Sequence, residues 1–189
     1  MHTIEELHRM LQERLSKKRY THSLNVAEES QRLAVRWNGD PDKAYVAGLL
    51  HDICKERPPA EQREMAAQSR LDVNPVELSV PSLWHAVAGA WYAQNVLHIA
   101  DKDVLNAIRY HTVARAGMTR LEEIVYMADL ISADRNYPDV DRMRKLAYSS
   151  LDKAMLAALS FSICEVVEKG SKLPRHTIEA YNQYTLIRK

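Results

Sequence analysis

Hydrophobic positions recur at helical spacing along most of the chain. In the first such segment, over about residues 4–16, Ile4, Leu7, Leu11 and Leu15 fall on one face of a helix. Only 5 glycines interrupt a sequence rich in Ala, Leu, Glu, Arg and Met, which are good helix formers. Apolar and polar residues nowhere alternate for long enough to predict a strand. The pattern therefore predicts an all-α fold.

Start and stop signals divide this pattern into separate helices. Asn38-Gly39 reads as a helix stop, and Asp40-Pro41 as an N-cap followed by proline at the first helical position. Ser82 and Asp101 are the expected N-caps of two later helices. The basic run 17–20 is expected to end the first helix, Thr21 to begin the second, and prolines 58–59 to end the third. A charged helix and a loop are expected over 60–80. Further helices are expected over 121–134, over about 140–169 and, as a short one, after Pro174.

Length and charge limit the classes of protein to consider. The chain has 189 residues, enough for one well-buried core, so we expect one domain over 1–189, with its core at about 20–135 and the helices of 140–189 packed on it. A net charge of +1 provides no general attraction for nucleic acid or an anionic membrane. Cys54 and Cys164 form no disulfide framework, and no segment resembles a membrane span or a secretory leader. We expect a cytoplasmic protein in which Cys54 packs as a small hydrophobe.

Polar side chains stand inside several of the apolar helices. His51-Asp52 ends the apolar run 44–50, and Asp129 lies within the run 125–131. An imidazole and a carboxylate are costly to bury unless a partner satisfies them, and a metal ion is a common partner. Three further histidines lie on or at the end of separate predicted helices, and a bundle can bring such positions around one interior pocket. These are His22, His85 and His111.

Imidazole nitrogens combined with carboxylates suit a first-row divalent or ferric ion, so we expect iron, manganese or cobalt. Such an ion lowers the pKa of bound water from about 16 toward 7 and polarises a phosphoryl oxygen, which is the chemistry of hydrolysis. Lys55, four residues beyond His51, is expected on the same face of a helix. Lys55 and Arg19, which precedes the helix of His22, would both add positive charge near the ion. The alternative is a bundle in which each histidine is satisfied separately by a carbonyl group.

Several short segments together resemble a known family. The pair His51-Asp52, with His22 and Asp129, resembles the HD phosphohydrolase superfamily from about Tyr20 to Asp134. The local sequences resemble, over nearly the whole chain, the YqeK family of bacterial symmetrical bis(5'-nucleosyl)-tetraphosphatases, which hydrolyse diadenosine tetraphosphate. The segments are 19–23, His51-Asp52-Ile53-Cys54-Lys55, His85-Ala86, Tyr110-His111-Thr112, Ala128-Asp129-Leu130-Ile131, Arg135 and 177–182.

The resemblance implies an HD-domain helical bundle with a central metal site, a homodimer, and hydrolysis of diadenosine tetraphosphate in its middle to two ADP. It implies that His22, His51, Asp52 and Asp129 hold iron, for which manganese or cobalt can substitute, and that His85 and His111 either complete a second metal site or touch the phosphates. Arg19, Lys55, Thr112 and Arg135 would hold the nucleoside diphosphate. The expected catalytic residues are Asp52, Lys55, His85 and His111, and the expected substrate-binding residues are Arg19, His22, Asp52, Lys55, His85, His111, Thr112, Asp129 and Arg135.

One departure from the family and two alternative functions stay open. Family members often carry a His-Pro pair before the C-terminal helix, where this chain has Leu173-Pro174-Arg175-His176, and Lys172, Arg175 and His176 are candidates to make the missing phosphate or base contact. The enzyme could act on another nucleotide, such as a deoxynucleoside triphosphate or a cyclic nucleotide. The chain could also be a sensor that binds ADP or GDP without turnover.

Overall fold

The structure is a computed structural model that describes residues 2–69 and 71–187. All regular structure within these residues is helical, so the prediction of an all-α fold is confirmed. In chain order the helices are α1 (Ile4–Arg14), α2 (Lys17–Arg36), α3 (Pro41–Leu50), α4 (Pro59–Gln68), α5 (Pro75–Leu78), the 3-10 helix η1 (Pro81–Leu83), α6 (Trp84–Asn95), α7 (Lys102–Tyr110), α8 (Arg120–Ile131), α9 (Val140–Ser149), α10 (Leu151–Glu168) and α11 (Arg175–Leu186).

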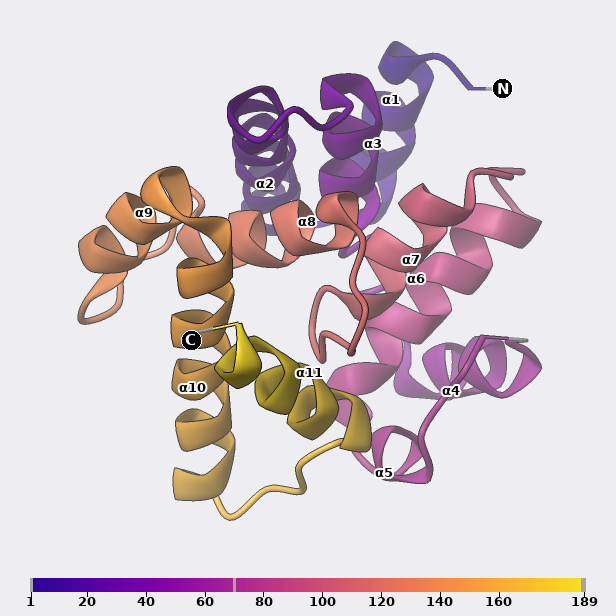
Figure 1. The fold of residues 1–189 in the computed structure, drawn as a ribbon. Helices are drawn as coiled ribbons and strands as arrows, with labels where there is room; N and C mark the ends of the chain where they lie inside the picture. The colour runs from indigo at the N-terminus through magenta and orange to yellow at the C-terminus, as the bar shows by residue number, and fades with distance from the viewer. Residues whose placement is uncertain (1, 70, 188–189) are drawn as a thin grey trace.

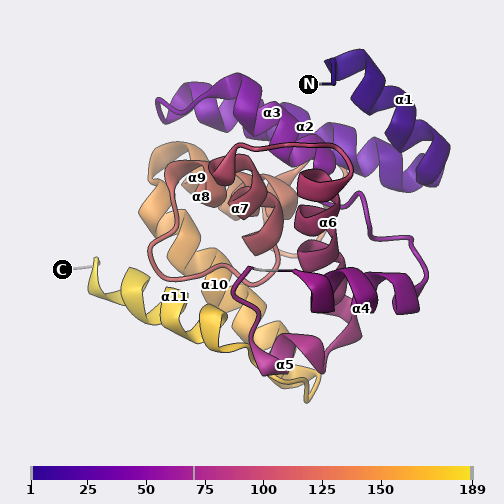
Figure 2. The ribbon, with the colours of Figure 1, turned by 90° about the vertical axis from the view of Figure 1, so that its right-hand side faces the viewer.

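Helix α8 lies in the middle of the bundle. It packs against α2, α3, α7, α9 and α10, and it separates the N-terminal helices from α10 and α11 (Figure 1). Turning the molecule by 90° shows α1–α3 along one end, with α10 and α11 on the opposite side and α4 and α5 beside them (Figure 2). A residue on α8 is therefore within reach of helices from both ends of the chain.

Helix α8 also joins the two hydrophobic clusters of the core. Val125 packs into the cluster of α1, α3, α6 and α7, whereas Ile124, Met127 and Ile131 belong to the cluster of α2, α9, α10 and α11. Burial of apolar side chains on both sides of one helix fixes its position and rotation. Of the described residues, none forms a helix that is long and apolar enough to cross a membrane.

Helices α2 and α3 approach each other closely at Gly48. A Cβ atom added there would lie 2.7 Å from Ser30 Oγ, 2.9 Å from Ala27 Cα and 2.9 Å from Val26 O. Only a residue without a side chain fits this contact, because real Cβ atoms are not found so near to other heavy atoms. The contact holds the C-terminal end of α3, where the His-Asp pair begins, against α2.

Two predicted helix boundaries near the N-terminus are wrong. The basic run 17–20 begins the second helix instead of ending the first, because Ser16 is the N-cap and its Oγ accepts a hydrogen bond from Arg19 N at 3.2 Å. The third helix ends at Leu50 rather than before Pro58, and residues 51–56 form turns. His51 and Lys55 therefore do not lie on one face of a helix, contrary to the expectation from their spacing.

Three later predictions also differ from the structure. Ser82 lies inside η1 and does not cap α6, whose N-terminal boundary residue is Leu83. The helix predicted over 121–134 ends at Ile131. The long helix predicted over 140–169 is split at Ser150, which is extended at φ −160 and whose side chain accepts from Lys153 N to start α10. The predicted N-caps Asp40 and Asp101 are confirmed, since each side chain accepts two backbone N–H groups.

Candidate functional site

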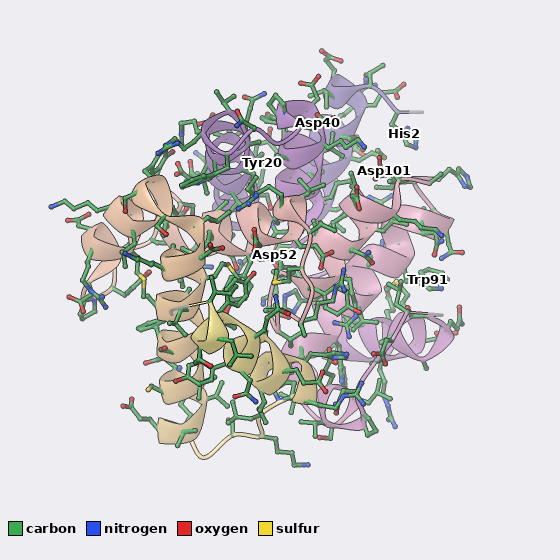
Figure 3. The ribbon with its side chains drawn as sticks, in the orientation of Figure 1. His2, Tyr20, Asp40, Asp52, Trp91 and Asp101 are labelled. Carbon is green, nitrogen blue, oxygen red and sulfur yellow. The ribbon has the colours of Figure 1, made fainter. Side chains whose placement is uncertain are left out.

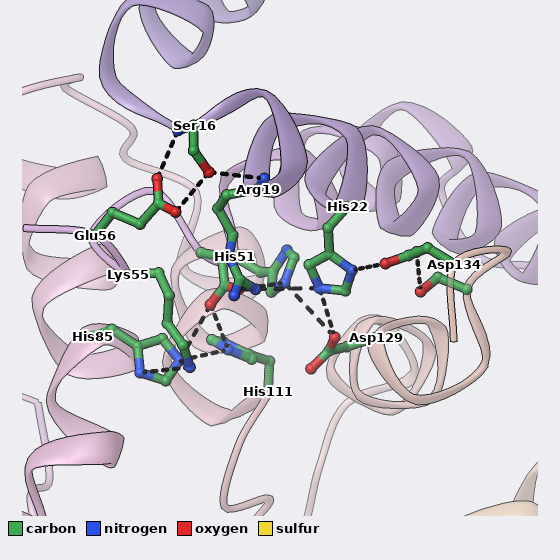
Figure 4. A network of polar contacts seen from close by, with 12 residues as sticks. Ser16, Arg19, His22, His51, Lys55, Glu56, His85, His111, Asp129 and Asp134 are labelled. Carbon is green, nitrogen blue, oxygen red and sulfur yellow. Dashed lines mark hydrogen bonds and ion pairs between the residues drawn. The ribbon is translucent and has the colours of Figure 1, made fainter. Parts of the chain in front are cut away.

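The polar residues predicted from the sequence meet in the interior of the bundle. Asp52 lies in the middle of the molecule, whereas Asp40 and Asp101 cap helices toward its outside (Figure 3). Figure 4 shows the imidazoles and carboxylates facing one another from five parts of the chain. They come from α2 (His22), the end of α3 (His51 and Asp52), the first turn of α6 (His85), the end of α7 (His111) and α8 (Asp129).

His51 and His111 are held by the same local arrangement. Each is the C-terminal boundary residue of its helix, and each Nδ1 donates to the carbonyl three residues earlier at 2.7 Å, Gly48 O for His51 and Ile108 O for His111. The hydrogen bond places the proton on Nδ1, so the lone pair of Nε2 points into the site. Both side chains are almost fully buried, so water does not satisfy these lone pairs.

Three buried polar atoms of this group have no hydrogen-bond partner among the described residues: His22 Nε2, His51 Nε2 and Asp52 Oδ1. Asp129 Oδ1 lies 3.0 Å from His22 Nε2 and 3.8 Å from His51 Nε2. Such atoms are costly to bury unless a ligand completes them. Two sets of side chains place potential ligand atoms within 4.8 Å of one another, and they share one histidine. These sets are His22, His51 and Asp129, and His51, Asp52 and His111.

This donor set fits a cation of the first transition series. The potential ligand atoms are imidazole nitrogens and carboxylate oxygens, and together they suit iron, manganese or cobalt better than calcium. The buried thiol of Cys54 packs in the apolar core, and burial raises its pKa to about 12. A protonated thiol is a poor ligand, so the prediction that Cys54 serves packing is consistent with its surroundings.

The orientation of His22 depends on Asp134, which was not among the site residues predicted from the sequence. His22 Nδ1 donates to Asp134 Oδ2 at 2.8 Å, and Asp134 Oδ1 accepts from Asn25 Nδ2 and Ser132 Oγ, each at 3.0 Å. A carboxylate on the outer nitrogen of a metal-binding histidine fixes its tautomer and raises its basicity. Asp134 is the last residue of the helix predicted over 121–134. The only sequence signal for a role in the site was its position directly before Arg135, a predicted substrate-binding residue.

Positively charged side chains surround the acids. Arg19 Nη1 donates to Asp52 Oδ2 at 2.6 Å. Arg135 Nε donates to the backbone oxygen of Asp129 at 2.7 Å, and its guanidinium also pairs with the Asp129 carboxylate. The side chains of both arginines are partly exposed, at 28% and 39%, so they lie at the rim of the site rather than in its interior. A bound phosphate chain can therefore compete for them.

Lys55 and His85 form a second group beside Asp52. Lys55 Nζ lies 3.1 Å from His85 Nε2, and that nitrogen is 3.2 Å from both Asp52 Oδ1 and His111 Nε2. Burial lowers the pKa of His85 well below its usual value although Asp52 opposes the shift, so His85 is neutral near pH 7. The pKa of Lys55 is also lowered, mainly by burial and to a smaller extent by repulsion from the charge of Arg19.

Both acids of the site are ionised. Burial by itself would raise the pKa of Asp52, but the imidazoles packed around it, His51 first and then His111 and His85, lower it well below its usual value. Burial would also raise the pKa of Asp129, but the neighbouring imidazoles of His22 and His51 and the positive charge of Arg135 outweigh burial, so the pKa of Asp129 is strongly lowered. The site thus offers negative oxygen ligands in its interior and positive side chains at its rim, and this arrangement can bind a cation and a phosphate chain together.

Lys172, Arg175 and His176 contact residues around α5 rather than the histidines and acids of this site. His176 is buried, and its ring nitrogens lie 2.9 Å from Glu77 Oε1 and 2.9 Å from Asp72 Oδ2. Lys172 Nζ donates to Ser79 Oγ at 3.1 Å, and Arg175 Nη2 lies 3.4 Å from the Asp72 carboxylate. These side chains attach α11 to the segment around α5. The expectation that Lys172, Arg175 or His176 makes a phosphate or base contact stays a prediction.

Comparisons with known proteins agree with the geometry. A family model described as "HD domain" matches residues 19–134. The chain is 35% identical to "Bis(5'-nucleosyl)-tetraphosphatase, symmetrical" of Bacillus subtilis (strain 168), over 94% of this chain and 95% of the relative. It is 34% identical to the protein of the same name from Staphylococcus aureus (strain NCTC 8325 / PS 47), over 96% of this chain and 94% of the relative.

A solved structure shares the whole fold. It is described as a predicted HD superfamily hydrolase involved in NAD metabolism, from Clostridium acetobutylicum. The two chains are 39% identical, the TM-score is 0.94, and each chain is covered to 100%. The similarity extends through α9, α10 and α11, beyond the residues that the family model matches.

Proposed function

The chain belongs to the HD domain family, and we propose that it is a metal-dependent hydrolase that cleaves diadenosine tetraphosphate symmetrically to two molecules of ADP. The observation that carries the proposal is the convergence of unpaired, buried imidazole and carboxylate atoms inside a ring of positive side chains. The names of the relatives from Bacillus subtilis and Staphylococcus aureus favour this substrate over a deoxynucleoside triphosphate, a cyclic nucleotide or binding without turnover.

The proposed metal ligands are His22, His51, Asp52 and Asp129. We propose iron as the ion, with manganese or cobalt as substitutes, because the ligand atoms are imidazole nitrogens and carboxylate oxygens. When bound, such an ion polarises a phosphoryl oxygen and acidifies water. His85 and His111 lie beside Asp52 and either complete a second ion site or contact the phosphates.

The proposed roles of the remaining residues follow from their charges. Arg19, Lys55 and Arg135 bind the phosphate oxygens and hold the chain so that water attacks a β-phosphorus in line with the leaving group. Asp52 orients the attacking water through the oxygen that has no partner, Oδ1. The new P–O bond forms as the bridging P–O bond on the far side breaks, and ADP leaves with the bond's electron pair.

The proposal is tested by incubating the protein with diadenosine tetraphosphate and iron(II) or manganese(II), and separating the products by anion-exchange chromatography. We expect ADP as the sole nucleotide product, and loss of at least about 100-fold in rate for Asp52→Asn, in line with the loss of a positioned acid–base group. Asp103→Asn, an exposed acid on α7, is the matched control and should retain full activity. Formation of ATP and AMP, or equal rates for both variants, would contradict the proposal.

Three further expectations remain proposals. We propose that residues 1–189 act as one domain, in which the core at about 20–135 nearly coincides with the matched residues 19–134. We also propose a cytoplasmic location, where a nucleotide substrate is available, and a homodimer. Sedimentation of the purified protein tests the homodimer, because a monomer at micromolar concentration would contradict it.

A further inference from the structure

Helix α2 begins with three basic residues. Its first turn consists of Lys17, Lys18 and Arg19 and contains no acidic residue. The N–H groups and the dipole make the start of a helix positive, so basic side chains are unfavourable there. One of the three, Arg19, donates to Asp52 at the rim of the proposed active site. A side chain that the site needs therefore lies where it destabilises its own helix.

Two other helices of the chain show what α2 lacks at its start. Helices α1 and α8 begin with a capping box, in which a glutamate at the third helical position accepts from the N–H of the N-cap residue. In α2 the N-cap is Ser16, and the third position is occupied by Arg19. Ser16 Oγ accepts from Arg19 N at 3.2 Å, but an arginine side chain has no acceptor to return the bond. The acid must come from another part of the chain.

Glu56 supplies this acid from the turn that carries Lys55. Its carboxylate accepts from Ser16 N at 2.6 Å and from Ser16 Oγ at 2.7 Å (Figure 4). Glu56 thus replaces the glutamate of a capping box and places a negative charge at the start of α2. Because Lys55 directly precedes Glu56, the bridge from Glu56 to Ser16 connects the segments that carry Arg19 and Lys55.

We propose that Glu56 is a positioning residue, which holds Arg19 and Lys55 so that both bind the same phosphate chain. The two side chains are positive and repel each other, and neither lies in the middle of a helix. Arg19 is in a first helical turn, where helices fray, and Lys55 is in a turn. The bridge opposes their separation. This inference rests on the phosphate-binding roles in the proposed function.

The direction of the effect distinguishes this role from that of a surface charge. Glu56 is exposed, and it lies beside the positive rim of the site. If it acted only through its charge, it would repel the phosphate chain, and its removal would lower KM. If it positions Arg19 and Lys55, its removal weakens their joint hold on the phosphates and raises KM. The two roles therefore predict changes of opposite sign.

The test compares Glu56→Ala with Glu61→Ala. Both changes remove an exposed carboxylate, but Glu61 lies on α4 and pairs with Arg57 rather than with the start of α2. KM and kcat are measured with diadenosine tetraphosphate. Calorimetry gives the affinity of the metal-free protein for manganese(II) and of the manganese-loaded protein for ADP.

We expect Glu56→Ala to raise KM and to weaken ADP binding by about three- to tenfold, less than the loss of a direct bond to a charged group. The value of kcat should stay within about twofold, because contacts made equally in the ground state and the transition state affect KM. Manganese affinity should not change, since Glu56 bonds to no proposed metal ligand. Glu61→Ala should keep all wild-type values.

Ser16 provides an independent check from the other end of the bridge. Ser16→Ala removes the hydroxyl that donates to Glu56 and accepts from Arg19 N, so it should also raise KM. Ser16→Thr keeps the hydroxyl and should restore KM to within about twofold of the wild type. The double variant of Ser16→Ala and Glu56→Ala should raise KM by less than the product of the single effects, because both changes break one bridge.

The outcomes separate the two proposals. A KM for Glu56→Ala at or below that of Glu61→Ala overturns the inference, and so does a parallel loss of manganese affinity, which would indicate a general structural role. If the wild type does not cleave diadenosine tetraphosphate, the proposed function fails, and the ADP affinities of the variants decide this inference. Absence of ADP binding to the wild type would refute both. If Glu56→Ala does not fold, as circular dichroism would show, equal KM and ADP affinity for Ser16→Ala and Ser16→Thr overturn the inference.

Discussion

Removal of the Asp134 carboxylate should weaken metal binding without unfolding the protein. Asp134 accepts three hydrogen bonds, from His22 Nδ1 at 2.8 Å and from Asn25 Nδ2 and Ser132 Oγ at 3.0 Å. Its own side chain is 35% exposed, so truncation leaves no cavity in the core. The main consequence of Asp134→Ala is that the imidazole of His22 loses the partner that fixes its tautomer and direction.

Loss of such a partner typically costs 10–100-fold in metal affinity, which corresponds to about 1.4–2.7 kcal/mol. We expect Asp134→Ala to fall in this range. Asp134→Asn keeps an oxygen that can accept from His22 Nδ1 but loses the negative charge, so its effect should be smaller than that of the alanine variant.

The assay is calorimetric titration of the metal-free protein with manganese(II), followed by measurement of kcat at saturating metal. Asp141→Ala is the matched control, because the Asp141 side chain is 83% exposed and its ion pair is with Arg144 on α9 rather than with a histidine. Equal affinities for Asp134→Ala, Asp141→Ala and the wild type would refute the reasoning that Asp134 acts through His22.

Three other predictions concern the scaffold and can be checked quickly. Gly48→Ala should lower the free energy of unfolding in urea by about 1–3 kcal/mol, because the new Cβ overlaps α2. Gly89→Ala, whose new Cβ would have its nearest neighbour at 3.4 Å, should lower the free energy of unfolding by clearly less. Hydrogen bonds to Glu77 and Asp72 raise the pKa of His176 above its usual value of about 6.5, so the stability that this residue contributes is fully present below that pH and is lost as the pH rises through the raised value. The difference in unfolding free energy between wild type and His176→Gln should therefore shrink from about pH 6 to about pH 9, and a difference that grows over this interval would show that the sign is wrong. In the native protein a thiol reagent should modify the exposed Cys164 rapidly and the buried Cys54 only after denaturation, and fast reaction at both thiols would contradict the packed position of Cys54.

The local features of the fold were predictable from the sequence. Helical spacing of the apolar residues gave the all-α class, and Asp40 and Asp101 were identified as N-caps. These features depend on neighbours within one or two turns, so the sequence contains all the partners involved. The boundary at Ser16 was misjudged because its conformation is stabilised by Glu56, whose carboxylate accepts from Ser16 N and Oγ at 2.6 and 2.7 Å from 40 residues away.

The chemistry of the site was also largely predictable, because a polar residue in an apolar helix is conspicuous without any coordinates. His22, His51, Asp52, His85, His111 and Asp129 were identified in this way or through family resemblance. Their sequence positions did not show how they meet. His51 and Lys55 were assigned to one helical face, whereas α3 ends at Leu50 and a turn carries both residues into the site.

What only the tertiary structure decided is the set of partners that are distant in the chain. The bond from His22 to Asp134 joins residues 112 positions apart, and the bond from Arg19 to Asp52 joins residues 33 positions apart. A sequence specifies which side chains are costly to bury alone, because that cost depends on the side chain itself. Which atom satisfies each of them depends on how the helices pack, and packing is a property of the whole chain.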